Sequence, residues 1–227
     1  ACDGANSKVR DKIAIDLLRH NFNQTALSFE LKVNTEIQKQ AFQFFLKESI
    51  LAVLPIRQGL VSIVWSCNSN FFTKLNGLDD KSIENELSQI IGNYYKDIKI
   101  ASKKESFPLF MNSVESIFKD RVLLVGDSAH FIHPMAGQGL NLGIRDIIFL
   151  EKIIDRKNYL DIGLRGFLRK YERARKEDVS QMGFLTLGLN WIFSKKSSIV
   201  TGLIEKGMGV LDKSKFLKQQ LIKKAIS

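Results

Sequence analysis

Four segments rich in Val, Ile and Phe follow one another between residues 25 and 67, and apolar and polar positions partly alternate in each of them. β-branched and aromatic residues with a period of two are typical of half-buried strands. Short polar stretches separate the segments, and "RQG" at residues 57–59 supplies a glycine where a tight connection between two strands requires a positive φ. The pattern predicts an antiparallel sheet over residues 25–67.

Residues 79–95 have helical periodicity, with Ile83, Leu87, Ile90 and Ile91 on one stripe and acidic residues in the first turn, where the helix dipole favours them. A lysine-rich strand or loop and Pro108 follow. The run "VLLV" at residues 122–125 is short and apolar on both faces, which predicts a strand buried in a parallel sheet.

The stretch "LNLGIRDIIFLEKII" also has helical periodicity, and the rest of the chain predicts two or three further helices. The apolar stripe of the first helix comprises Leu140, Ile144, Ile147, Ile148 and Ile154. "MGFLTLGLNWIF" at residues 182–193 is too short to span a bilayer and predicts a buried or interfacial helix.

The composition fits a globular chain of one or two domains, with 227 residues, 44% of them hydrophobic and 26% charged. Cys2 and Cys67 are too few for a disulfide scaffold, so we expect a reducing compartment and no structural zinc. The first ten residues contain neither an initiator Met nor a signal peptide, so we expect the chain to begin within a longer protein.

The net charge of +10 does not by itself indicate nucleic-acid binding, because the lysines are spread along the chain without an arginine-rich arm. The most basic segments are "RKYERARK" and "KSKFLKQQLIKK" in the last third. They predict solvated helix faces, with contact to an anionic membrane surface as the alternative.

The richest loop, "GDSAHFIHPMAGQGLN" at residues 126–141, directly follows the predicted buried strand. It is not a dinucleotide fingerprint, because Gly137, Gly139 and Gly143 are spaced GxGxxxG and lie too far from the strand. His130 and His133 have no third ligand nearby, so no metal site is expected, and they can equally anchor the loop to the backbone. Ser128 lacks the glycines of a hydrolase elbow.

The residues of this loop fit a cofactor cradle better. Asp127 stands at the carboxyl end of the predicted strand, where it can accept hydrogen bonds from sugar hydroxyls, and Gly126 lets a ligand approach the backbone. Pro134 stiffens the approach to a helix that begins near Gly139, whose unpaired N–H groups suit an anionic or electron-rich group.

Two motifs carry a resemblance to a known family. "GDSAHFIHPMAGQGLNLGIRD" resembles the second flavin-contact motif of the single-component FAD-dependent aromatic hydroxylases, most closely the branch that hydroxylates a ubiquinone precursor. "ACDGANSKVR" resembles the DG motif of the same superfamily. Met135 departs from the more usual aliphatic residue, and the chain lacks the GxGxxG half with which family members open.

The resemblance implies a fold of the α+β or α/β class. It comprises an incomplete FAD-binding domain of the Rossmann-like, glutathione-reductase type, an antiparallel substrate-domain sheet and a C-terminal helical tail. The expected segments are residues 1–24 with the DG motif, 25–107 with the substrate sheet, and 108–227 with the return strand, the GD loop and the helices. A separate N-terminal FAD-binding half is an expected partner.

The resemblance also implies roles for individual residues. Asp127 would bind the FAD ribose and Gly126 would lie near the pyrophosphate, while Asp3 and Arg10 would shape the flavin and nicotinamide region, Arg10 as a possible phosphate partner. The expected cofactor residues are Asp3, Gly4, Arg10, Gly126, Asp127, Pro134, Gly137, Gln138, Gly139 and Asn141. The candidate substrate wall is Phe42, Phe44, Leu54 and Trp65, with ordinary sheet core as the alternative.

In the implied reaction NADH or NADPH reduces FAD, and O2 supplies the oxygen for the ring of a polyprenylated phenol. No catalytic side chain and no metal are implied, because the flavin carries the chemistry. We expect a cytoplasmic protein, peripheral at the inner face of the membrane. Two alternatives stay open: another flavin oxidoreductase on this scaffold, such as a prenyl-lipid reductase, and an inactive remnant or interaction module.

Overall fold

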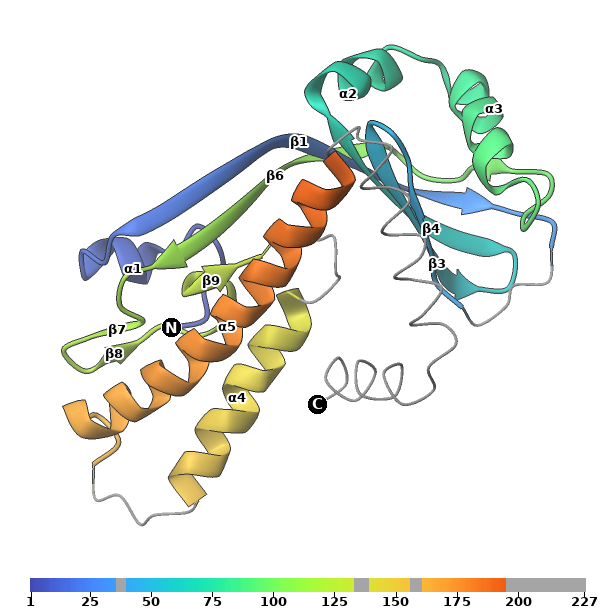
Figure 1. Cartoon of the computed structure of the whole chain (residues 1–227). Coiled ribbons are helices and arrows are strands. Elements are labelled where there is room, and N and C mark those ends of the chain that lie inside the picture. Colours follow the sequence, from blue (N-terminus) through green and yellow to red (C-terminus); the bar gives the residue numbers. More distant parts are fainter. Residues whose placement is uncertain (36–39, 133–138, 156–160, 195–227) are drawn as a thin grey trace. The chain divides into compact units, whose positions relative to one another are not determined.

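The computed structural model describes residues 1–35, 40–132, 139–155 and 161–194. Contacts divide the chain into Ala1–Leu187 and Gly188–Ser227. The first of these units contains the sheet, the helices as far as Leu187 and the cavity, and its main elements are labelled in Figure 1.

An antiparallel sheet forms the centre of this unit, in the order β2-β3-β4-β1-β6-β9 with β5 paired to β1. Its strands are β1 Leu17–Lys32, β2 Phe42–Phe45, β3 Ser49–Arg57, β4 Leu60–Asn68, β5 Lys99–Ile100, β6 Glu105–Val114 and β9 His130–Phe131. The predicted antiparallel sheet is confirmed, and β1 begins earlier than expected. Pro108 lies inside β6, in the part of that strand that pairs with β1 but not with β9, and prolines within sheets are confined to such edge positions.

The β3–β4 hairpin turns through two residues, Gln58 and Gly59, between the paired Arg57 and Leu60. Gly59 has φ +74°, so the positive φ predicted from the sequence is confirmed. A Cβ at this position would meet only the Val33 carbonyl oxygen, at 3.7 Å. Backbone conformation rather than space therefore requires a glycine here.

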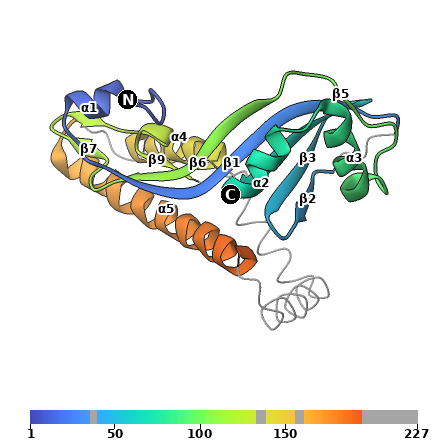
Figure 2. The same ribbon diagram turned by 90° about the horizontal axis from the view of Figure 1, so that it is seen from above.

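Two helices cover one face of the sheet, α2 Ser69–Asn76 and α3 Asp80–Ile91 (Figure 2). The predicted helix is confirmed as α3, whose N-terminus is capped by the Asp79 carboxylate accepting from the Ser82 N–H at 3.1 Å. Ile83, Leu87 and Ile91 are fully buried against the strands, whereas Ile90 is half-buried.

A second hydrophobic cluster lies toward the other end of β1 and β6, around α4 Gly139–Asp155 and α5 Arg165–Ser194. Its centre contains Leu124, Ile153 and Tyr171. The short helix α1 Lys8–Lys12 precedes β1. The predicted segment boundaries after residues 24 and 107 fall inside β1 and β6, and the pairing of these two strands shifts register between Asn21 and Gln24, close to the first boundary.

The apolar run at residues 122–125 is paired differently from the prediction. Its strand β8 Val122–Leu123 forms an antiparallel hairpin with β7 Phe118–Lys119, so the predicted position inside a parallel sheet is wrong for this pair. On the other side the Ala1 amino group donates to the Leu123 carbonyl, and the Val125 N–H donates to the Ala1 carbonyl at 2.9 Å. These two bonds form the pattern of a parallel bridge.

The predicted helix after the glycine-rich loop is confirmed as α4, but most of its apolar stripe faces outward. Leu140 is 75% exposed, and Ile144, Ile147 and Ile148 are about half exposed. The buried side of the helix carries Leu142, Asp146 and Ile153 instead. A period of 3.6 residues shows that a helix has an apolar face, but not that the partner of this face lies in the same chain.

The last described helix, α5, is a single element of 30 residues. It contains the whole segment 182–193 that was predicted to be buried or interfacial, and Phe184 within that segment is 75% exposed. Among the residues that the structure describes, no helix carries an apolar stretch sufficient to cross a bilayer.

We predict that Gly59→Ala lowers the free energy of unfolding by about 1 kcal/mol, because an L-residue is strained at positive φ. Gly59→Asn should cost less, since asparagine adopts this conformation more readily. Urea denaturation of the three proteins measures the difference. Equal stability of the alanine variant and the parent chain would contradict this account of the turn.

Candidate functional site

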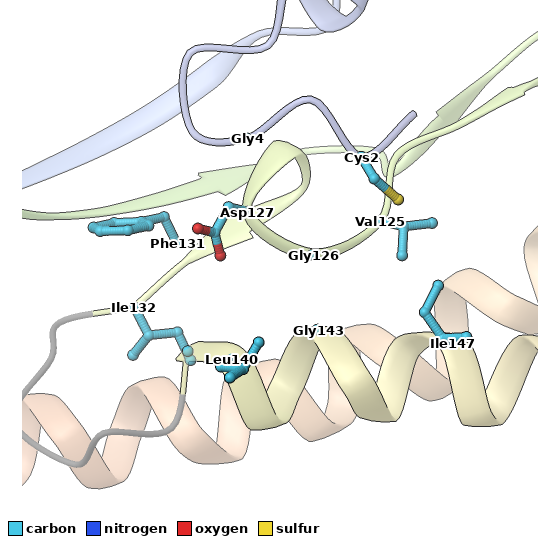
Figure 3. A pocket seen from close by; sticks show the side chains of 11 residues that line it. Cys2, Gly4, Val125, Gly126, Asp127, Phe131, Ile132, Leu140, Gly143 and Ile147 are labelled. Atoms are coloured by element: carbon cyan, nitrogen blue, oxygen red, sulfur yellow. The ribbon is translucent and has the colours of Figure 1, made fainter. Parts of the chain in front are cut away.

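A cavity of about 550 Å³ lies between the first residues of the chain, the loop after β8 and the start of α4 (Figure 3). Its size is within the range of small-molecule sites, about 300–1,000 Å³. The lining residues are Cys2, Gly4, Val125, Gly126, Asp127, Phe131, Ile132, Gly139, Leu140, Gly143 and Ile147. The cavity therefore brings together the two motifs that lie far apart in the sequence.

Asp127 belongs to the single 3-10 turn η1 Gly126–Ser128, and its carboxylate lies beside Phe131 in the cavity (Figure 3). No described residue donates a hydrogen bond to this carboxylate. Burial raises the pKa of Asp127 above the ordinary carboxyl value, and the nearby His130 partly opposes this. The structure thus places a half-buried acceptor, free of protein partners in the described residues, on the cavity wall.

Four glycines line the cavity: Gly4, Gly126, Gly139 and Gly143. Gly126 has φ +62°, and a Cβ added to it would lie 3.8 Å from the Gly143 Cα, so α4 packs closely against η1 at this point. Gly4 has φ +83°, and a Cβ on Gly4 or on Gly139 would meet no atom within 4 Å. These two positions border open space, as the edge of a ligand cradle would.

The DG segment is held by its own side chains. The Asp3 carboxylate accepts from the Ser7 hydroxyl at 2.5 Å and from the Val9 N–H at 3.1 Å, and the Ser7 bond is the largest of the causes that lower the Asp3 pKa. Arg10 is 3% exposed and donates from Nη1 to the carbonyls of Ala5 and Ser128, at 3.1 and 3.2 Å. Its buried guanidinium therefore joins the DG segment to η1, which favours a positioning role over direct phosphate contact.

The floor of the site rests on the buried carboxylate of Asp146 in α4. Its Oδ2 accepts from the Gly126 N–H at 2.7 Å and lies 2.9 Å from His130 Nε2, and its Oδ1 accepts from Arg175 Nε at 2.6 Å. Arg175, on α5, also donates from Nη1 to Asp178 at 2.8 Å. One carboxylate thus connects η1, β9, α4 and α5.

Hydrogen bonding outweighs burial in setting the protonation state of Asp146. Burial alone would raise the pKa of Asp146, but the bonds and attraction of His130, followed by the bonds from Gly126 and Arg175, lower it below the ordinary carboxyl value. The carboxylate is therefore ionised at neutral pH and remains an acceptor for all three donors.

Sequence reasoning missed Asp146 and Arg175. The sequence did contain a sign of Asp146, because this acidic residue lies one helical turn after Leu142, on the side of α4 opposite the apolar stripe. Arg175 was assigned to the solvated face of "RKYERARK", but Arg175 and Tyr171 of this segment are buried. His130 anchors the loop as one alternative predicted, through the Asp146 side chain rather than through the backbone.

The remaining predicted cofactor residues divide into two groups. Asn141 lies half-buried in the first turn of α4 and takes part in interactions with its surroundings. Pro134, Gly137 and Gln138 lie outside the described residues, as do His133 and Met135. Their predicted contacts with the flavin ring stay predictions.

The four residues proposed for the substrate wall do not share one face of the sheet. Trp65 is fully buried beneath α2 and α3, pairs with Leu51, and donates from Nε1 to Ser49 Oγ at 3.0 Å. Phe44 also pairs with Leu51, and Phe42 packs on the same cluster. Leu54 points to the opposite face and is 40% exposed. For Trp65, Phe42 and Phe44 the alternative of sheet core describes the structure better.

Comparison with known proteins identifies the class to which this fold and cavity belong. A family model described as FAD binding domain matches residues 1–182, and the chain belongs to this FAD-binding monooxygenase family.

Two curated relatives show where in this family the similarity lies. The chain is 29% identical to the mitochondrial ubiquinone biosynthesis monooxygenase of Dictyostelium discoideum, an alignment that covers 97% of this chain and 54% of the relative. It is 28% identical to the ubiquinone hydroxylase UbiL of Rhodospirillum rubrum, over 99% of this chain and 53% of that protein. The chain thus spans about half the length of these relatives.

A solved structure agrees in fold. The p-nitrophenol 4-monooxygenase PnpA of Pseudomonas putida superposes with a TM-score of 0.76 at 16% identity, covering 100% of this chain and 58% of that one. At this identity the similarity concerns the fold alone, and it confirms a mixed α and β architecture. The finer assignment to a glutathione-reductase type of domain stays a prediction.

We predict that Asp146→Asn lowers the free energy of unfolding at pH 7 by about 3 kcal/mol, because Arg175 loses its buried counter-charge. A carboxyl with a lowered pKa adds stability that is present above its unfolded pKa and is lost as pH falls through its folded pKa. The difference in the free energy of unfolding between the parent chain and Asp146→Asn should therefore shrink below about pH 4. Urea denaturation at several pH values measures it.

Asp178→Asn is the matched control, since Asp178 binds the same arginine but is 32% exposed. Its cost should be smaller. Equal costs for the two variants would mean that burial of the Asp146 carboxylate does not matter.

Proposed function

We propose that this chain carries the flavin-ring side and the substrate sheet of an FAD-dependent monooxygenase that hydroxylates the phenolic ring of a polyprenylated ubiquinone precursor. Family membership and the two ubiquinone-related relatives support the choice of reaction. The observation that carries the proposal is the carboxylate of Asp127, which has no partner among the described residues and faces a cavity bordered by Gly4 and Gly139.

In this proposal Asp127 accepts hydrogen bonds from ribose hydroxyls, Gly126 and Gly4 allow the ligand to approach the backbone, and the first turn of α4 faces its electron-rich end. Bound FAD would supply the redox chemistry. Overall, NAD(P)H gives two electrons, one oxygen atom of O2 enters a ring C–H bond, and the other leaves as water. The task of the protein is to hold the ring and exclude water.

A second polypeptide segment, the dinucleotide-binding half of the family, would complete the site. Leu140, Ile144, Ile147 and Ile148 form an exposed apolar stripe along α4. Two of them, Leu140 and Ile147, also line the cavity, so the stripe continues into the cavity wall. A contiguous exposed apolar surface of this kind marks an interaction site. A partner on this stripe would close the cavity from the open side.

The substrate wall is better sought on the face of the sheet that α2 and α3 leave uncovered. Leu54 lies there at 40% exposure, and Phe107, which pairs with Ala26 on the same face, is 50% exposed. An apolar wall suits a phenol with a polyprenyl tail, because such a substrate buries much hydrocarbon surface.

Such a substrate resides in a membrane, so we also propose peripheral contact of the protein with the cytoplasmic face of the membrane through basic helical residues.

The decisive experiment is to prepare the chain with and without a family N-terminal half and to record the visible absorption spectrum of each sample. Flavin absorption retained only by the combined sample, with NAD(P)H-dependent hydroxylation of a prenylated phenol, is the expected result. Flavin reduction without oxygen insertion would indicate the reductase alternative. A colourless combined sample would contradict the proposal and favour a remnant.

We predict that Ile148→Lys prevents the combined sample from retaining flavin while the isolated chain keeps its stability, because a charge would be buried at the docking surface. Ile162→Lys is the matched control, since Ile162 is 50% exposed and lies outside α4. Gel filtration with detection at the flavin wavelength reports both association and cofactor. Retention of flavin by the Ile148 variant would exclude this docking surface.

We predict that Asp127→Asn weakens FAD binding about 10-fold, since hydrogen bonds to a charged acceptor exceed those to a neutral one. The same variant should not lose stability without ligand. A carboxyl whose pKa is raised on folding costs stability above its folded pKa, and that cost disappears with the charge. Fluorescence titration measures the affinity for FAD, and urea denaturation at pH 7 measures the stability without ligand. A destabilised variant with unchanged FAD affinity would refute the assigned role.

A further inference from the structure

A second group of polar and aromatic side chains lies beside the flavin cavity, on β1, β6 and β9, and the proposed flavin contacts do not use it. Arg19 is exposed on β1, and its guanidinium carbon lies 4.5 Å from the centre of the Phe110 ring. Its Nε donates to Asn112 Oδ1 at 3.1 Å. The guanidinium is therefore held over the Phe110 ring, and its two terminal nitrogens have no partner among the described residues.

Asn112 provides a second, independent sign of a binding site. Asn112 is 1% exposed, and its side-chain Nδ2 has no hydrogen-bond partner among the residues that the structure describes. The amide cannot be turned round, because Arg19 offers only donors and must face the oxygen. A buried donor without an acceptor costs stability, so the amide is in place to donate to a group that is not part of the chain.

The group continues to the cavity itself. Asn112 pairs with Phe131 across β6 and β9, and the rings of Phe110 and Phe131 are in contact, tilted by 34° with centres 4.9 Å apart. Phe131 lines the cavity next to Asp127 (Figure 3). An exposed cation, a buried amide and two aromatic rings in contact thus lead from Arg19 to the wall of the proposed flavin site.

We propose that Arg19, Asn112 and the Phe110–Phe131 pair bind the pyridine nucleotide that reduces the flavin, with Arg19 on its diphosphate. The proposal rests on the function proposed above and adds the location of the electron donor. A fixed guanidinium with free terminal nitrogens binds phosphate oxygens in a bidentate manner, and aromatic faces accept a planar heterocycle. The flavin diphosphate belongs instead near Gly126, which lies on the opposite side of Asp127 from Phe131 in Figure 3.

The test is an NMR titration of the chain with NADPH, NADH and FAD, following the Arg19 Nε–H and the Asn112 side-chain amide. Either pyridine nucleotide should shift both signals at lower concentration than FAD does. A stronger response to FAD would assign the site to the flavin diphosphate, and no response to NADPH or NADH would overturn the proposal.

Arg19→Gln should weaken NADPH binding at least about 10-fold, because a charge-assisted bidentate contact is lost. Arg57→Gln is the control, since Arg57 is an exposed arginine of β3 and its replacement changes the net charge equally. Arg19→Lys should restore binding only in part, since lysine keeps the charge but not the planar fork. Equal weakening by the Arg19→Gln and Arg57→Gln variants would show only general attraction to a basic chain and refute the site.

Because the titration uses the chain alone, its outcome is separate from that of the proposed function. Flavin retention by the combined sample should be the same for the parent chain and for Arg19→Gln. Loss of flavin from the variant would mean that Arg19 serves the flavin, which contradicts this proposal and not the function. A colourless parent sample that still binds NADPH at Arg19 would contradict the function and support the site.

Discussion

The carboxylate of Asp146 accepts hydrogen bonds from the backbone of Gly126 and the ring of His130, which lie close together in the sequence, and from the guanidinium of Arg175 on the distant helix α5. Gly126 has a positive φ and lies close to Gly143 of α4, and this bond fixes the Gly126 N–H on the same helix. Asp127 is the next residue, so the orientation of its carboxylate toward the cavity depends on the same bond. A buried ion pair adds little to stability in itself, because desolvation opposes the attraction. We infer that its value here is geometric, since it defines the wall of the cavity.

Arg10 performs a similar task at the other end of the cavity. Its guanidinium, bonded to the carbonyls of Ala5 and Ser128, holds the DG segment against η1. The two family motifs therefore meet through buried polar side chains, while the groups that face the cavity are an unpartnered carboxylate, glycines and apolar side chains. This division is what a cofactor site requires, because residues that contact a ligand must be held by residues that do not. The exposed stripe of α4 beside the cavity fits a site whose remaining wall comes from another segment.

Local features of the fold could be predicted from the sequence, and long-range ones could not. Alternation over residues 25–67 and the glycine at position 59 depend on neighbouring residues, so the strands and their turn were predicted correctly. The sequence does not show on which face of the sheet α2 and α3 pack. For that reason Trp65 and Leu54 were grouped in one substrate wall, although they lie on opposite faces. The pairing of Asp146 with Arg175 joins two helices, and neither residue shows in a single sequence that the other is its partner. The position of Asp127 beside a cavity could be anticipated because strand ends and glycine-rich corners have a recurrent geometry, whereas its role toward a ligand stays a prediction.

Hydrogen–deuterium exchange of the chain combined with a family N-terminal half, measured with and without FAD, tests the central claim that the two motifs form one flavin cavity. The account predicts that FAD slows exchange at residues 1–5 and 126–132, with no change in the β3–β4 hairpin. Slower exchange confined to the hairpin would contradict the account. Unchanged exchange at both motifs in a sample that retains flavin would contradict it as well.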